Sequence, residues 1–162
     1  PVMPMVYDYY LSAGADVLLL RHLFGGYLKT FYVIVFGYSA FAFLTSFARE
    51  VIKDMEDYKG DIQTGCKTMH IVWGMITSKV VTFFLIVITI GLLLLASIKF
   101  YTYRQYISVY YILGLVVLPL TLLIVQVIRA QSSRDFKMAS LLLKFIMLFG
   151  IAFTLIIKYL YE

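Results

Sequence analysis

The sequence predicts an all-α protein, built as a polytopic transmembrane helical bundle. Hydrophobic residues make up 62% of the 162 residues, and the mean hydropathy is +0.91. A soluble domain is normally about half apolar. Because a chain this small cannot bury such an excess in its core, part of its outer surface must be apolar and face lipid.

Four runs with few or no charged residues predict the membrane helices, at residues 30–48, 80–98, 105–128 and 138–158. Each run is close to the roughly 20 residues that a helix needs to cross the hydrocarbon core. Strands are excluded because the apolar residues are continuous instead of alternating. Pro119 lies inside the third run, where we expect it to kink the helix.

Residues 1–29 are expected to form the end of a preceding membrane helix, followed by an interfacial segment. Gly25 and Gly26 should then break the chain before the first predicted span. The whole of 1–162 is interpreted as a single transmembrane domain.

The charge pattern favours a membrane protein over a nucleic-acid-binding one. The net charge is +5, but the basic residues are spread singly between the apolar runs, as interfacial anchors are. Loops on the side that includes residues 49–79 carry more Lys and Arg than the other loops. This bias predicts that side to be cytoplasmic.

The segment 49–79 is the one loop that carries chemistry, and it holds five of the nine acidic residues: Glu50, Asp54, Glu56, Asp57 and Asp61. On a continuous helix four of these carboxylates, all but Glu56, would share one face. Like charges at such spacings destabilise a helix, and a divalent cation would offset the repulsion. Clustered carboxylates suit Mg²⁺, while Cys66 and His70 alone make zinc a poor candidate. The alternative is a solvated loop with ordinary ion pairs.

This segment also resembles a known family. Arg49-Glu50-x-x-Lys53-Asp54-x-x-Asp57-x-x-Gly60-Asp61, followed by Gly65-x-Lys67-Thr68 and Gly74, is similar to the second aspartate-rich motif of the UbiA superfamily of intramembrane prenyltransferases. The residues of this motif are most similar to those of the branch of geranylgeranylglycerol-phosphate geranylgeranyltransferases, which make ether lipids. Relatives that prenylate quinone or haem precursors share the general pattern.

The resemblance implies a role for each residue of the motif. Asp54, Asp57 and Asp61 would hold Mg²⁺ against the diphosphate of an isoprenyl donor. Lys67, Arg49, Lys53 and Glu50 would form the substrate-binding set around the phosphates. The prenyl tail would lie among aromatic side chains such as Phe36, Phe41, Phe43 and Phe47, and the acceptor would be a lipid or an aromatic compound.

The chain departs from the family pattern in two respects. His70 stands where the family has Pro, and only the second of two aspartate motifs is present. With the start at Pro1, this suggests the C-terminal half of a longer enzyme, which alone would be inactive. The alternative functions are a cation-binding or transporting protein and a purely structural membrane subunit. The four predicted spans contain no acidic residue, which disfavours an ion path.

Overall fold

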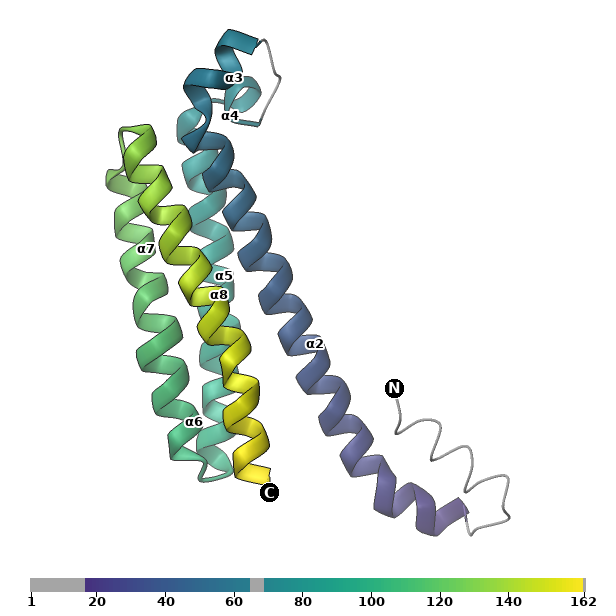
Figure 1. Ribbon diagram of the computed structural model, residues 1–162. Coiled ribbons are helices and arrows are strands. Elements are labelled where there is room, and N and C mark those ends of the chain that lie inside the picture. The colour runs from purple at the N-terminus through teal and green to yellow at the C-terminus, as the bar shows by residue number, and fades with distance from the viewer. Residues whose placement is uncertain (1–16, 65–68, 162) are drawn as a thin grey trace. The chain divides into compact units, whose positions relative to one another are not determined.

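The computed structural model describes residues 17–64 and 69–161, with side chains for 32–58, 60–62 and 71–155. All regular elements in these ranges are helical (Figure 1). They are α2 (Val17–Glu56), α3 (Tyr58–Thr64), α4 (Met69–Trp73), α5 (Met75–Thr102), α6 (Tyr106–Tyr111), the π-helical turn η1 (Ile112–Val117), α7 (Leu118–Arg129) and α8 (Ser133–Tyr161). Two compact units divide the chain at Ala40. The first contains the N-terminal part of α2, and the packing described below belongs to the second, Phe41–Glu162.

Within the described residues, four helical stretches are long and apolar enough to cross a membrane: Tyr32–Glu56, Met75–Thr102, Tyr106–Arg129 and Ser133–Leu155. Their outward faces expose large apolar side chains, among them Phe84, Leu95 and Ile151. Such surfaces are costly in water and stable against lipid. The chain is therefore an integral membrane protein with the predicted polytopic all-α architecture.

The first helix begins earlier than the sequence predicted. Helix α2 starts at Val17 and not at residue 30, and it runs unbroken through Gly25 and Gly26. The expected break there is wrong, because a glycine costs a helix only about 1 kcal/mol and leucines precede the pair. The expected end of a preceding helix falls on residues 1–16, outside the described residues.

Other boundaries also extend beyond the apolar runs. Helix α5 begins at Met75 and α8 at Ser133, both before their predicted starts at 80 and 138. The predicted loop 49–79 consists largely of the end of α2, of α3 and of α4. Polar residues such as Ser78 and Lys79 permit helix, so a change in hydropathy marks the edge of the hydrocarbon and not the end of the helix.

The core lies where the end of α2 meets α5, α7 and α8. Its fully buried side chains include Ile52 and Met55 of α2, Ile86 of α5, Leu120 of α7 and Leu143 of α8. Helix α5 meets its neighbours through small buried residues: Ser78, Thr82, Thr89 and Ser97. Each of these hydroxyls donates to the carbonyl four residues back, so small polar groups are buried without an unpaired donor.

The third span carries the effect of Pro119. Immediately before it the helix widens into η1, and the N–H of Leu118 donates to the carbonyl of Leu113, five residues back. Proline has no N–H and its ring crowds the carbonyl four residues earlier. A π turn accommodates that crowding, so the proline alters the pitch of the helix and does not end it.

One end of the second unit gathers the polar connections. Figure 1 shows α3, α4 and the turn between α7 and α8 at the same end, with the α5–α6 connection at the other. This is the alternation that the apolar runs predicted. Acidic residues at the end of α2 are thereby brought to the end of the bundle where α8 begins.

Candidate functional site

The acidic segment spans two helices and the bend between them. Five of the residues singled out from the sequence lie on α2: Arg49, Glu50, Lys53, Asp54 and Glu56. Asp57 stands at the bend, and its backbone oxygen accepts hydrogen bonds from the N–H groups of Gly60 and Asp61, at 2.9 and 3.0 Å. Asp61 therefore sits in the first turn of α3.

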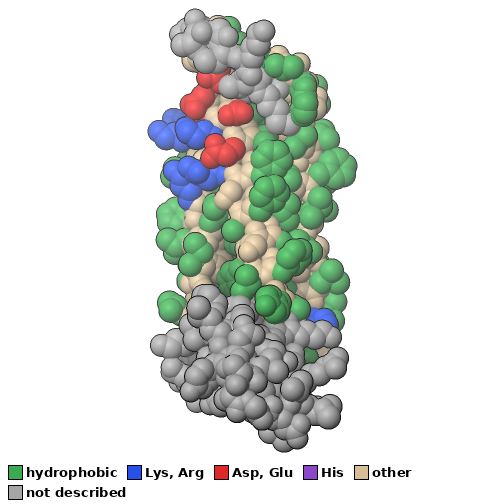
Figure 2. Space-filling model, turned by 90° about the vertical axis from the view of Figure 1, so that its right-hand side faces the viewer, with side chains coloured by type: hydrophobic (Ala, Val, Ile, Leu, Met, Phe, Trp, Pro, Cys, Tyr) green, Lys and Arg blue, Asp and Glu red, His purple; other side chains and the backbone are tan. Residues whose placement is uncertain are grey.

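The prediction that four carboxylates share one face of one continuous helix is wrong. Helix α2 ends at Glu56, before the last two of them. Repulsion between carboxylates three and four residues apart disfavours continuing the helix through Asp57. Figure 2 nonetheless shows acidic side chains gathered near one end of the face, beside Lys and Arg side chains.

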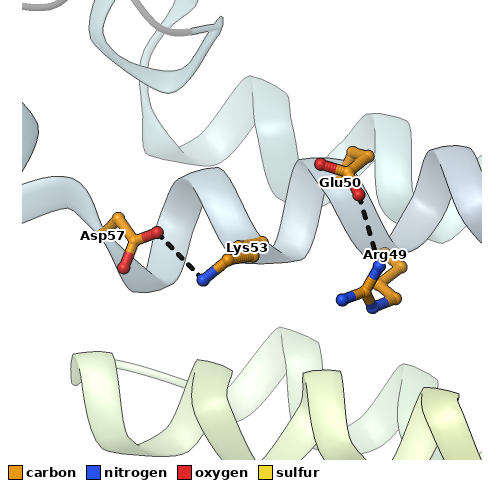
Figure 3. Close-up of polar contacts among 4 residues, drawn as sticks. All are labelled: Arg49, Glu50, Lys53 and Asp57. Carbon is orange, nitrogen blue, oxygen red and sulfur yellow. Dashed lines mark hydrogen bonds and ion pairs between the residues drawn. The ribbon is translucent and has the colours of Figure 1, made fainter.

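Two ion pairs organise the end of α2 (Figure 3). Lys53 Nζ donates to Asp57 Oδ2 at 3.2 Å, and Arg49 Nη1 donates to Glu50 Oε1 at 3.4 Å. All four side chains are partly exposed, and such pairs contribute at most about 1 kcal/mol to stability. The two pairs matter for the positions of the side chains, because each keeps a cation beside a carboxylate where a phosphate could bind.

The carboxylates suit a hard cation by their chemistry more than by their present geometry. Within the described side chains, no group of three or more Asp, Glu, His or Cys residues is arranged to hold a metal ion. Mg²⁺ usually takes only one or two protein carboxylates and completes its shell with water and substrate phosphate. Carboxylates such as Asp54, Asp57 and Asp61 therefore fit a Mg²⁺ that arrives together with a diphosphate.

A polar groove of about 630 Å³ lies between the end of α2 and the start of α8. Its lining residues are Glu56, Asp57, Ser133, Arg134, Lys137, Met138 and Leu141. Two carboxylates thus face two cations across the groove, and no ion pair in the described part of the chain involves Arg134 or Lys137. The groove has room and charge for a phosphate-bearing ligand.

Arg134 and Lys137 were not predicted as site residues. From the sequence they were counted only as basic residues on the presumed cytoplasmic side. What could have identified them is topology, since they start a helix on the same side of the membrane as the acidic segment. The two segments are far apart in the sequence, so no local pattern indicates that they lie together.

The start of α8 is fixed by a reciprocal cap. Asp135 Oδ2 accepts from the N–H groups of Gln131 and Ser132, at 3.1 and 3.0 Å, while the N–H of Asp135 donates to Ser132 Oγ at 3.4 Å. A capping box of this kind satisfies the free N–H groups of the first turn. The cap therefore holds Arg134 and Lys137 at the mouth of the polar groove.

Other predicted residues lie elsewhere. Lys67 is outside the described residues. Phe41 is half-buried and packs against the core, whereas Phe36, Phe43 and Phe47 are exposed. The three exposed rings remain available to lipid or to a prenyl chain.

Comparison with known proteins finds a matching family. The sequence model described as "UbiA prenyltransferase family" matches residues 9–149. A digeranylgeranylglyceryl phosphate synthase of Thermococcus onnurineus is 59% identical over 39 residues, which are 24% of this chain and 14% of that protein. The synthase of Thermococcus sibiricus bearing the same name is 52% identical over 44 residues, 26% of this chain and 16% of that protein.

The matched segments thus span less than a fifth of these curated relatives. No solved structure gives a significant match to the chain.

Proposed function

Because this chain belongs to the UbiA prenyltransferase family, we propose that it transfers an isoprenyl group from an allylic diphosphate to a glycerol-phosphate ether lipid. The observation that carries the proposal is the paired acidic and basic residues at the end of α2, at one end of four apolar spans. The names of the Thermococcus relatives support the choice of acceptor.

The donor diphosphate is assigned to the acidic segment. Asp54, Asp57 and Asp61 would hold Mg²⁺, which supplies positive charge to the leaving diphosphate. Lys53 is already beside Asp57, at 3.2 Å, and would contact a phosphate oxygen from there. Lys67 is proposed for the same anion, and Glu50 orients the guanidinium of Arg49.

The reaction exchanges one carbon–oxygen bond for another. The bond between the allylic carbon and the diphosphate breaks, and the diphosphate leaves with the electron pair. A hydroxyl oxygen of the acceptor forms the new bond to that carbon and loses its proton. No oxidant or reductant is required, so the protein's task is to orient both substrates, exclude water and stabilise charge.

The apolar surroundings suit the hydrocarbon parts of both substrates. The rings of Phe43 and Phe47 are stacked, with centroids 6.2 Å apart, on an exposed face of α2. A prenyl chain lying there would remain in a lipid-like environment while its diphosphate reaches the end of the helix. On the charge bias, this end of the protein is proposed to face the cytoplasm.

A radiolabelled transfer assay in detergent tests the proposal on the chain joined to an N-terminal half that carries the first aspartate motif, with geranylgeranyl diphosphate as donor and an alkylglycerol phosphate as acceptor. We expect product with Mg²⁺ and none in EDTA. Asp57→Asn should reduce the rate at least tenfold, on the order of the loss of one charge-stabilising group.

Glu56→Gln is the matched control, because it neutralises the adjacent carboxylate without touching the proposed metal ligands. It should reduce the rate much less than Asp57→Asn. Full activity in EDTA, or equal losses for the two variants, would refute the assignment of the metal site.

A further inference from the structure

Two cations meet in a second groove, deeper between α2 and α8. This apolar groove has a volume of about 630 Å³ and is lined by Arg49, Lys144, Met147, Leu148, Ile151 and Ala152. Four of its six residues are hydrophobic. The positive charges therefore stand at the edge of an apolar surface that is continuous along one side of α8.

Both cations lie inside candidate membrane spans. Lys144 follows the start of α8 at Ser133, and Arg49 precedes the end of α2 at Glu56. By the apolar runs, Arg49 stands at the edge of the run 30–48, whereas Lys144 lies six residues, about 9 Å, inside the run 138–158. An ionisable group at the depth of Lys144 is costly unless paired, and such groups mark sites that handle charge.

The nearby protein groups neutralise this pair only in part. Arg49 reaches Glu50 at 3.4 Å, which is long for a charged hydrogen bond, and its Nε is buried without a partner. Among the described side chains none forms a hydrogen bond or an ion pair with Lys144. The groove thus combines excess positive charge with a hydrophobic wall.

We propose that this apolar groove binds the lipid acceptor, with its phosphate between Arg49 and Lys144. The hydrocarbon chain of the acceptor lies along Met147, Leu148 and Ile151. This assignment rests on the proposed function. It reassigns Arg49 from the donor diphosphate to the second substrate, which thereby has its own anion site. It differs from a snorkelling role for Lys144, which would require no ligand.

The chemistry favours a phosphomonoester over the diphosphate donor. A diphosphate with its metal needs carboxylates. Among the described side chains, the one carboxylate that forms an ion pair with a lining residue of this groove is that of Glu50, which pairs with Arg49. Two cations match the double charge of a phosphomonoester without any metal. The acceptor can therefore bind before the donor and independently of Mg²⁺.

The spacing of the two anion sites suits the reaction. Arg49 lies on α2 and Asp57 directly follows its last residue, eight positions later, which is about 12 Å at the rise of a helix. A glycerol phosphate anchored at Arg49 can extend its hydroxyl along the helix toward a donor held at Asp57. Both grooves are lined by residues of α8, so the two substrates would lie along the same neighbouring helix.

Direct binding tests the proposal without turnover. The chain is placed in phosphatidylcholine nanodiscs with EDTA, and the probe is 1-O-octadecylglycerol 3-phosphate. We expect Lys144→Met to weaken binding about tenfold or more, the usual cost of losing one charged hydrogen bond. Lys144→Arg should restore most of the binding. Lys99 is an exposed lysine at the far end of α5, so Lys99→Met should leave the binding unchanged.

Competition identifies the source of the phosphate. Octadecylglycerol lacks the phosphate and should compete at least tenfold more weakly than the probe. Equal competition by octadecylglycerol, by phosphatidylglycerol or by geranylgeranyl diphosphate in EDTA would overturn the proposal. Unchanged binding in a folded Lys144→Met protein would do the same, with folding checked by gel filtration and thermal unfolding.

The transfer assay separates the two proposals. Failure of the binding test alongside Mg²⁺-dependent transfer would remove the acceptor site and leave the function standing. Specific phosphomonoester binding without transfer, under conditions where the family's chemistry should proceed, would remove the function instead.

Discussion

Lys79 Nζ donates a hydrogen bond of 2.6 Å to the backbone oxygen of Ala130, and a second one of 3.2 Å to that of Ile128. A lysine on α5 thus caps the C-terminal end of α7, where carbonyls lack partners and the helix dipole favours a cation. The same ammonium stands 5.7 Å from the centre of the buried Phe136 ring. This one side chain joins α5 to the corner between α7 and α8.

Replacing Lys79 should therefore loosen the corner that positions the polar groove. We expect Lys79→Met to lower the free energy of unfolding by about 1–2 kcal/mol, because two carbonyls lose a charged donor. Lys79→Arg should recover part of that loss. Chemical unfolding in detergent measures both, with Lys99→Met as the control, and equal stability of the two methionine variants would contradict the capping role.

Gly150 of α8 lies against the ring of Phe41 on α2. A Cβ added there would lie 2.7 Å from Cζ of Phe41 and closer still to Cε1. We expect Gly150→Ala to destabilise the fold by about 1–3 kcal/mol, the usual cost of overpacking, as measured by thermal unfolding. Gly91→Ala on α5 is the matched control: nothing lies within 4 Å of that position, so the helix preference of alanine should make it neutral or stabilising.

A second variant distinguishes a ring clash from a backbone effect. In the double variant Gly150→Ala with Phe41→Leu, the smaller side chain makes room for the added methyl group. Its stability should be higher than the sum of the two single changes allows. Simple additivity would mean that the two residues do not meet.

The arrangement of the helix ends predicts which residues share a side of the membrane. In a Cys66→Ser background, single cysteines at Tyr58 and Gln131 should react with an impermeant maleimide from the same side. A cysteine at Tyr103, between α5 and α6, should react from the opposite side. Labelling of Tyr58 and Gln131 from different sides would contradict the polytopic arrangement.

Residues 1–162 alone are expected to bind a diphosphate weakly and to show no turnover. The described acidic segment presents carboxylates without a group of three that could hold a metal, and a diphosphate is held best by charges converging from several directions. Calorimetry should detect Mg²⁺-dependent binding of a non-hydrolysable geranylgeranyl diphosphate analogue. Steady prenyl transfer by this chain alone would show that no opposing motif is needed.

The sequence predicted the helical class and the four spans because the hydrocarbon core imposes a minimum length on apolar runs. The ends of the helices could not be predicted in the same way. Gly25 and Gly26 were expected to break the chain, yet α2 continues through them. A membrane helix has few competing structures, so residues that end helices in water are tolerated there.

The sequence predicted which acidic and basic residues form much of the candidate site, but only part of their arrangement in space. The acidic residues near Asp54 could be found because charge is rare in this chain. The bend at Asp57 could not be found, since it reflects repulsion and propensity acting together. Arg134 and Lys137 became visible only when the fold placed the start of α8 against the end of α2, because no local pattern encodes a contact between distant segments.

The π turn η1 sets the rotational phase of the helix that follows it. Buried residues before and through the turn recur at intervals of four: Ser108, Ile112, Val116 and Leu120. In a regular α-helix that interval would drift by about 40° at each step, whereas the wider turn absorbs the drift. Deleting one residue from η1 would allow a regular α turn in its place and would keep the phase of α7. A further residue inserted there would instead rotate all of α7 by about 100° and turn Leu120 and Leu123 from the core toward lipid. The third span should therefore tolerate the loss of one residue in this stretch better than the gain of one.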